Sequence, residues 1–289
     1  MRDIVQRSAL LLLAVSTLLA QQPPTVKWEE LTALDFAAGI ERSQGVCLLP
    51  FGVLEKHGPH LPLGTDLLNV RYVSVAAAQR EFAVVFPQYF AGQIFEAMHE
   101  PGTVAYSPSL QLMLLQETTS EMARNGCKKI IVVNGHGGNT SLLPFFSQSQ
   151  LASPRDYVVY AYLRPQTPPG GPAKKSANDG HAGESETAKT LVSHPDLVKL
   201  DRAGLQSGAD RRRLDLPAGL YTGIWWYAKY PEHYAGDGAV AIRELGEHQM
   251  EAWIAGIANA IRAVKSDQTS LRLQNEFFEK SRRPLETKQ

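Results

Sequence analysis

The chain has 289 residues, of which 44% are hydrophobic and 20% charged, a balance typical of a soluble globular protein with a sizeable core. Its 29 lysines and arginines equal its 29 aspartates and glutamates, so charge gives no argument for nucleic acid or an anionic membrane as a partner. A small, uncharged or zwitterionic ligand fits this composition better.

Residues 1–20 are predicted to be a secretory signal peptide. Arg2 and Arg7 precede an apolar run from Ala9 to Ala20 that is too short to span a bilayer comfortably. A core helix or an uncleaved anchor is the alternative, but the polar residues 21–27 that follow are typical of a linker. We therefore expect an exported protein, periplasmic or secreted, without membrane attachment after cleavage. The mature chain would stay near neutral, with 27 basic and 28 acidic residues.

The first half of the chain alternates between helical and strand-like patterns. Apolar residues at helical spacing predict helices at residues 28–44, 67–81 and 109–125. Short apolar runs predict strands at residues 46–50, 82–86 and 129–133. Continuous apolar strands are typical of a parallel sheet that is covered on both faces. The pattern therefore indicates an α/β fold.

The second half is less regular. A helix at 142–151 and a strand at 157–163 are predicted first, and residues 164–179 then contain too much proline and glycine for regular structure. A helix follows Gly180 and ends near Ser193, and residues 216–239 are expected to be irregular and aromatic. A long amphipathic helix at 240–264 and a charged tail at 269–289 complete the chain. No internal repeat or boundary divides the predicted domain, residues 28–268.

The two cysteines, Cys47 and Cys127, adjoin two of the predicted strands. If those strands are neighbours, the pair could form a disulfide in an oxidising compartment, although buried free thiols are equally compatible with the pattern. Two cysteines this far apart do not make a zinc–thiolate site.

Three polar loops carry histidines and carboxylates at or near the ends of predicted elements. Glu55, His57 and Asp66 follow the strand at 46–50, His136 lies in the loop NGHGGN, and Glu186 stands at the start of a later helix. Because open α/β sheets bind ligands at the carboxyl ends of their strands, we expect these residues to converge. Imidazole and carboxylate ligands without thiolate suit Zn, Mn or Fe(II).

The spacing of the ligands favours two metal ions. Glu55 and His57 are two residues apart, so in extended backbone both project to one side and each can reach one of two adjacent ions, which Asp66 could bridge. Such a pair of ions activates water and polarises a carbonyl, so we predict hydrolysis of an amide or related C–N bond. His181 is the candidate acid/base that protonates the leaving nitrogen.

Several residues leave alternatives open. By itself NGHGGN also fits a turn or a phosphate-binding loop, and Glu184 rivals Glu186 because both lie at the start of the same helix. His60 is expected to orient a metal ligand, while His194, His233 and His248 are assigned to the surface or core. Trp225 and Trp226 either cover the pocket or pack against the loop.

The segments PFGVLEKHGPHLPLGTD, VNGHGGN and HAGESETA resemble, in this order, the three signature motifs of the creatininase (creatinine amidohydrolase) superfamily. The resemblance implies a three-layer α/β/α fold around a mainly parallel sheet, a binuclear metal centre, and hydrolysis of a cyclic amide or a formamide. By the same resemblance, Glu55 and His136 would hold one metal, His57 the other, and Asp66 would bridge them. It also implies a homo-oligomer, commonly a hexamer assembled from dimers.

Two departures from creatininase itself bear on the substrate. Gly138 stands where creatininase has a carboxylate, which resembles the deformylase-like and peptide-processing branches, in which the glutamate of the third motif, here Glu186, is a ligand. Gly180 replaces an acidic residue, which argues against creatinine. We therefore expect a binuclear amidohydrolase acting on a small cyclic or linear amide. The alternatives are a deformylase-like hydrolase of formamides and a non-catalytic exported binding protein on the same fold.

Overall fold

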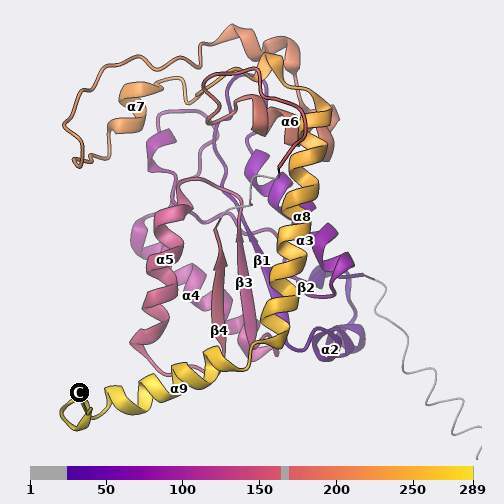
Figure 1. Ribbon diagram of the computed structural model, residues 1–289, viewed down its shortest axis with the longest axis vertical. Helices are drawn as coiled ribbons and strands as arrows, with labels where there is room; N and C mark the ends of the chain where they lie inside the picture. The colour runs from indigo at the N-terminus through magenta and orange to yellow at the C-terminus, as the bar shows by residue number, and fades with distance from the viewer. Residues whose placement is uncertain (1–24, 164–168, 289) are drawn as a thin grey trace, which may run out of the picture.

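A computed structural model describes residues 25–163 and 169–288 of the chain (Figure 1). The predicted signal peptide and residues 21–24 of the predicted linker lie outside these ranges. Residues 25–27 are not a free linker, because Val26 is buried and its carbonyl accepts a hydrogen bond of 2.8 Å from the backbone N–H of Val85. Within the described ranges, no helix is both long enough and apolar enough to cross a membrane.

The centre of the fold is a parallel sheet of four strands in the order β2-β1-β3-β4. The strands are β1 (Val46–Phe51), β2 (Val84–Val85), β3 (Lys129–Asn134) and β4 (Val158–Tyr162). Val46 pairs with Lys129, and Leu48 pairs with both Val85 and Ile131. This topology confirms the predicted parallel sheet, although β2 is shorter than expected.

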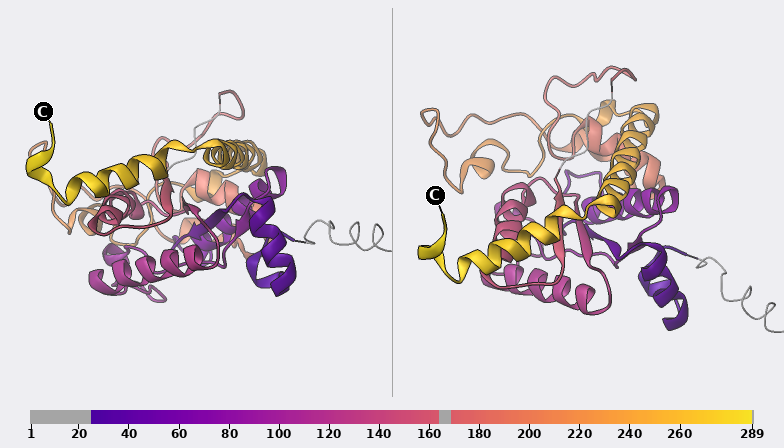
Figure 2. Two further views of the ribbon diagram at one scale, coloured as in Figure 1. Left: turned by 90° about the horizontal axis from the view of Figure 1, so that it is seen from below. Right: turned by 60° about the horizontal axis from the view of Figure 1, so that its bottom comes forward.

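Helices cover both faces of the sheet (Figure 2). Side chains of β1 alternate between the faces, as the pleat of a strand requires. Val46 and Leu48 pack with helices α3 (Thr65–Arg80) and α8 (Arg243–Ser266), whereas Leu49 and Phe51 face α4 (Pro108–Arg124) and α5 (Asn139–Ser149). The three-layer α/β/α fold is therefore confirmed.

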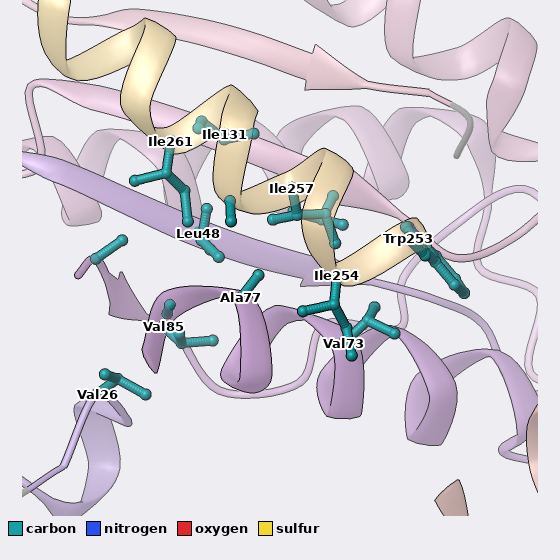
Figure 3. Close-up of a cluster of buried hydrophobic side chains, with 14 of the residues drawn as sticks. Val26, Leu48, Val73, Ala77, Val85, Ile131, Trp253, Ile254, Ile257 and Ile261 are labelled. Atoms are coloured by element: carbon teal, nitrogen blue, oxygen red, sulfur yellow. The ribbon is translucent and has the colours of Figure 1, made fainter. Parts of the chain in front are cut away.

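The core on the α3 and α8 side is built from a regular stripe of α8 (Figure 3). Trp253, Ile254, Ile257 and Ile261 recur at helical spacing and pack over α3 and the sheet. Burial of each large apolar side chain contributes about 1.5–3 kcal/mol. This stripe explains why a helix so late in the chain forms part of the central core.

The remaining elements differ from the sequence predictions mainly at their ends. The predicted helix 28–44 is divided, because Thr32 caps a new helix by accepting a hydrogen bond from the Asp35 backbone N–H. The other α-helices are α2 (Ala33–Arg42), α6 (Glu184–Ser193), α7 (Trp225–Lys229) and α9 (Thr269–Ser281). The 3-10 helices are Trp28–Glu30, Phe95–Ala97, Gln150–Ala152, Pro195–Leu197, Leu200–Leu205, Gly238–Val240 and Pro284–Glu286. The expected irregular segment 216–239 thus contains α7, and the charged tail contains α9.

Cys47 and Cys127 form a disulfide, with 5.6 Å between their Cα atoms. Cys47 lies in β1, and Cys127 lies just before the neighbouring β3. Both side chains are fully buried. The structure therefore selects the paired alternative over free thiols.

The connections after β1 and β3 run to opposite faces of the sheet. The chain leaves β1 for α3 on one face and leaves the adjacent β3 for α5 on the opposite face. Such a reversal between neighbouring strands is where open α/β sheets bind ligands. The loops after β1 and β3 both begin there, at the end of the sheet nearer α6 and α7 (Figure 1).

Candidate metal centre

The loop from β1 to α3 brings Glu55, His57 and Asp66 together, and all three side chains are buried. Gly52 makes this path possible, since a Cβ atom there would lie 2.7 Å from the backbone nitrogen of Leu67. Burying two carboxylates beside one imidazole is unfavourable unless further positive charge or hydrogen-bond donors offset it. The loop therefore needs partners from other elements.

His136, from the loop after β3, is the first of these partners. Its Nδ1 lies 2.8 Å from Glu55 Oε1 and 2.8 Å from Asp66 Oδ2. Its Nε2 lies 3.0 Å from the carbonyl oxygen of Gln93 and must carry a proton there, because a carbonyl only accepts hydrogen bonds. Nδ1 is thus the nitrogen that faces the carboxylates, where a single ring N–H would satisfy at most one of them.

His57 is oriented in the same way as His136, with one ring nitrogen bound to a backbone carbonyl and the other facing a carboxylate. Its Nδ1 donates to the backbone carbonyl of Glu55 at 3.2 Å, which leaves Nε2 facing Asp66 Oδ1 at 3.3 Å. Asp66 therefore turns one oxygen toward His136 and the other toward His57. The two oxygens of Asp66 thus contact two different imidazoles.

The structure separates the two glutamates at the start of α6. Glu186 Oε2 lies 3.9 Å from His57 Nε2 and accepts a hydrogen bond of 2.6 Å from the Ala182 backbone N–H. Glu184 is buried away from the cluster and accepts hydrogen bonds from the backbone N–H groups of Lys175 and Ser176. Glu186 therefore belongs to the cluster, and Glu184 anchors the segment that precedes α6.

Gly138 fits this arrangement. A Cβ atom at this position would lie 2.6 Å from His136 Nε2 and 2.8 Å from the Gln93 carbonyl oxygen. Any side chain there would disturb the hydrogen bond that orients His136. The loop therefore offers no carboxylate at this point, and the third carboxylate comes from Glu186.

His181 also lies in the cluster, with its ring centroid 4.2 Å from that of His57. Its Nε2 donates to the Lys56 carbonyl at 2.7 Å, and its Nδ1 lies 3.8 Å from Glu186 Oε2. Burial lowers the pKa of His181 to about 4, although the carboxylate of Glu55 opposes this shift. The imidazole is therefore neutral at neutral pH, with a free lone pair on Nδ1.

His233 was missed by the sequence analysis, which assigned it to the surface or core. Its side chain is 2% exposed, and its Nε2 lies 2.5 Å from Glu55 Oε2. Its φ angle of 47° is uncommon for a residue other than glycine. Its segment, YPEHYAG, follows no strand and carries no glycine loop before the histidine. The one available signal was a histidine among aromatic residues that could border a pocket.

Two other histidines contact different partners. His60 Nε2 lies 2.8 Å from Thr187 Oγ1, so His60 ties the first loop to α6 and, among the described contacts, does not orient one of the clustered side chains as expected. His99 Nε2 lies 2.7 Å from the carbonyl oxygen of Pro231, to which it donates.

The residues present fit divalent metal ions. Glu55 Oε1 and Asp66 Oδ2 are buried and, among the described residues, have no hydrogen-bond partner. Burial opposes protonation of His57, but Asp66 and Glu55 outweigh it and raise the pKa of His57 to about 9. Burial also opposes protonation of His136, yet Glu55 and Asp66 raise its pKa well above the usual value. The carboxylates thus attract positive charge to these two positions, and metal cations with nitrogen and oxygen ligands would replace those protons.

A groove of about 510 Å³ lies beside the cluster. Its lining includes Gln93, Phe95, Met98, Tyr221, Trp225 and Tyr227. Gln93 belongs to both sites, because its carbonyl accepts the hydrogen bond that orients His136. The groove is therefore linked to the cluster through Gln93, although none of the clustered side chains lines it.

Sequence comparison identifies similar proteins over most of the chain. The profile of the creatininase family, described as creatinine amidohydrolase, matches residues 29–261. The creatinine amidohydrolase of Pseudomonas putida is 28% identical over 258 residues, covering 81% of this chain and 95% of that protein. The mycofactocin precursor peptide peptidase of Mycolicibacterium smegmatis is 30% identical over 234 residues, covering 78% of this chain and 87% of that protein.

Solved structures agree with this likeness. The manganese form of creatininase superposes with a TM-score of 0.66 at 26% identity, over 84% of this chain and 100% of that chain. A creatininase variant of the Zn–Zn type gives a TM-score of 0.66 at 25% identity, over 84% and 99% of the two chains. The similarity therefore extends through the sheet, its helices and the loops that carry the cluster.

Proposed function

Because the chain belongs to the creatininase family and is a metal-dependent amidohydrolase, we propose that it binds two divalent ions and hydrolyses a C–N bond of a small cyclic or linear amide. One observation carries this proposal. Three imidazoles, His57, His136 and His181, each donate one N–H to a backbone carbonyl and turn the other nitrogen toward carboxylates. This donor set suits Zn, Mn or Fe.

The distances support a division of the donors between two ions. Glu55 Oε1, His136 Nδ1 and Asp66 Oδ2 would hold the first ion. His57 Nε2, Asp66 Oδ1 and Glu186 Oε2 would hold the second. When bound, the two ions supply a water nucleophile at neutral pH and polarise the carbonyl of the substrate.

His181 is the proposed acid/base. Its Nε2 proton is committed to the Lys56 carbonyl, so Nδ1 is the atom that accepts a proton. The low pKa keeps this nitrogen unprotonated until the reaction supplies a proton. His181 would then pass that proton to the leaving nitrogen, which must be protonated as the C–N bond breaks.

A peptide amide is the second candidate substrate. Gly138 leaves the second motif without a carboxylate, and one relative, which is 30% identical, is a precursor peptide peptidase. The groove of about 510 Å³ also offers apolar surface that a small polar amide would not need. These features favour a substrate with an apolar group next to the scissile bond.

We also propose that the chain is exported and that it forms a homo-oligomer. The Cys47–Cys127 disulfide supports export, because disulfides persist mainly in oxidising compartments. Exposed apolar side chains on α4 and α5, among them Met113 and Phe145, support a contact between copies. N-terminal sequencing of the exported protein and light scattering test these two points.

The central test combines elemental analysis with a substrate screen. The export-processed protein should contain two equivalents of Zn, Mn or Fe, and it should turn over at least one member of a panel of creatinine, lactams, formamides and short peptides. Glu55→Gln and His136→Ala should lose both metal and turnover. Less than about one metal per chain, or full amidase activity in both variants, would overturn the proposal. Stoichiometric ligand binding without turnover would instead indicate a binding protein.

A further inference from the structure

We propose that Trp226 and His233 are positioning residues that fix the carboxylate of Glu55, so that only Oε1 faces the first metal position. The inference rests on the proposed function, because it concerns a ligand of that centre. Its basis is a chain of two hydrogen bonds, from Trp226 to His233 and from His233 to Glu55. These three residues come from α7, from the segment that follows α7, and from the loop after β1.

The first hydrogen bond determines which nitrogen of His233 carries the proton. Trp226 Nε1 lies 2.8 Å from His233 Nδ1, and an indole nitrogen can only donate. His233 Nδ1 must therefore accept, which excludes both the imidazolium form and the tautomer protonated at Nδ1. The proton of the neutral imidazole lies on Nε2.

The second hydrogen bond follows from the first. His233 Nε2–H donates to Glu55 Oε2 at 2.5 Å, with both side chains buried. The other oxygen, Oε1, has no hydrogen-bond partner among the described residues and lies 2.8 Å from His136 Nδ1, which is equally close to Asp66 Oδ2. His233 thus occupies one oxygen of the carboxylate and leaves the other for a cation.

The positions of the ring protons exclude a separate metal site around Glu55 Oε2. Glu55, His181 and His233 lie close enough to suggest one. However, His181 Nε2 donates to the Lys56 carbonyl, and His233 Nε2 donates to Glu55. Both nitrogens therefore present protons rather than lone pairs, and a histidine binds metal only through a lone pair.

The backbone holds His233 in this position. The residue has a φ angle of 47°, its N–H donates to the Tyr230 carbonyl at 3.0 Å, and its carbonyl accepts from Gly58 N–H. A conformation of this kind costs free energy and persists where the surrounding structure determines it. Trp226 also packs edge-on against the ring of His233, with 5.7 Å between centroids.

Substitution of Trp226 separates the hydrogen bond from the packing. Trp226→Phe removes the N–H donor and keeps an aromatic ring, so His233 can place its proton on either nitrogen. Loss of a partner that orients a metal ligand typically weakens metal binding about 10–100-fold.

The measurement is the Zn²⁺ dissociation constant from competition with a chromophoric chelator. The absorption spectrum of the Co²⁺-loaded protein provides a second readout. Trp225→Phe is the matched control, since Trp225 Nε1 donates to Tyr221 Oη instead.

Two substitutions at His233 test whether restoring the hydrogen bonds restores metal affinity. His233→Gln retains an amide N–H for Glu55 and an oxygen that can accept from Trp226, whereas His233→Leu has similar bulk and neither group. We expect Zn²⁺ affinity to fall about 10–100-fold in His233→Leu, and His233→Gln to recover most of the loss. Thermal unfolding of each metal-free variant checks that it is folded.

The outcomes distinguish this inference from the proposed function. Wild-type affinity and an unchanged Co²⁺ spectrum in folded Trp226→Phe and His233→Leu would overturn the inference and leave the metal centre intact. Equal losses in His233→Gln and His233→Leu would also overturn it, because hydrogen bonding would then be irrelevant. Absence of metal from the wild-type protein would instead contradict the proposed function.

Discussion

Asp66 Oδ2 and His136 Nδ1 lie 2.8 Å apart, although Asp66 belongs to the first turn of α3 and His136 to the loop after β3. The two residues meet because β1 and β3 are adjacent and their loops open at the same end of the sheet. The other oxygen of Asp66 faces His57, so this one carboxylate contacts both imidazoles that are proposed to hold metal.

The bridging arrangement predicts that Asp66→Asn damages both positions at once. The amide keeps the size of the side chain but loses the negative charge, and one oxygen becomes an N–H donor. Loss of a residue that merely orients a ligand weakens binding about 10–100-fold, so loss of the bridge itself should exceed about 100-fold. Metal content by elemental analysis should fall from two ions to one or fewer. The exposed Asp196→Asn should retain both ions, and two tightly bound ions in Asp66→Asn would contradict the bridge.

Replacement of glutamate by glutamine should affect metal content differently at Glu184 and at Glu186. Glu186→Gln should lower the metal content from two ions to about one, because Glu186 Oε2 faces His57 at the second position. Glu184→Gln should retain both ions and instead weaken the anchoring of the segment before α6, where Lys175 and Ser176 donate to it. Elemental analysis and limited proteolysis report the two effects. Metal loss in Glu184→Gln alone would reverse the assignment.

The raised pKa of His57 predicts how the protein stripped of metal responds to pH. The pKa rises from 6.5 in the unfolded chain to about 9 in the fold, so the contribution of the bound proton to stability is full only below pH 6.5. That contribution is lost as the pH rises to about 9, and it is on the order of 3 kcal/mol. Denaturant unfolding of the chelator-treated protein should therefore show falling stability between pH 6.5 and 9.

Metal binding should follow the opposite trend over the same range. An ion at the second position competes with the His57 proton, so Zn²⁺ affinity should increase from pH 6.5 to 9. Binding at pH 7 should also release protons, which calorimetry in buffers of different ionisation enthalpy detects. An affinity independent of pH would contradict a protonated His57 in the metal-free protein.

The disulfide predicts a redox-dependent stability. Replacing Cys47 and Cys127 together by alanine should lower the free energy of unfolding by roughly 2–4 kcal/mol, since the bond closes a long loop between adjacent strands. A reductant that acts on the unfolded chain should lower the unfolding temperature of the wild type. The double variant should not respond, because it has no bond to reduce. An equal response in both proteins would argue against the disulfide.

The sequence was sufficient to predict the sheet, its covering helices and six of the clustered residues, namely His181 and the five expected metal ligands. β1 and β3 are short apolar runs, and each leads directly into a polar loop, so Glu55, His57, Asp66 and His136 could be identified when these loops were considered together. Glu186 could be identified because it opens a helix in a recognisable motif.

The parts that could not be predicted depend on contacts between distant segments. His233 reaches Glu55 only because its loop folds back toward the loop after β1, and its neighbours offer no more than a histidine among aromatic residues. Glu184 and Glu186 are distinguished by the direction of their side chains on the first turn of α6, which spacing alone does not settle. Pairing of the cysteines likewise required the strand order.

Helix α7 constrains how the substrate preference of this protein could change. Trp225 and Tyr227 line the groove, while Trp226, between them, reaches toward Glu55 through His233. Three consecutive residues therefore have two different structural roles. Substitutions of Trp225 and Tyr227 could therefore change the groove and admit new substrates. A shift of α7 by one residue would instead move Trp226 away from His233 and disturb the proposed metal centre.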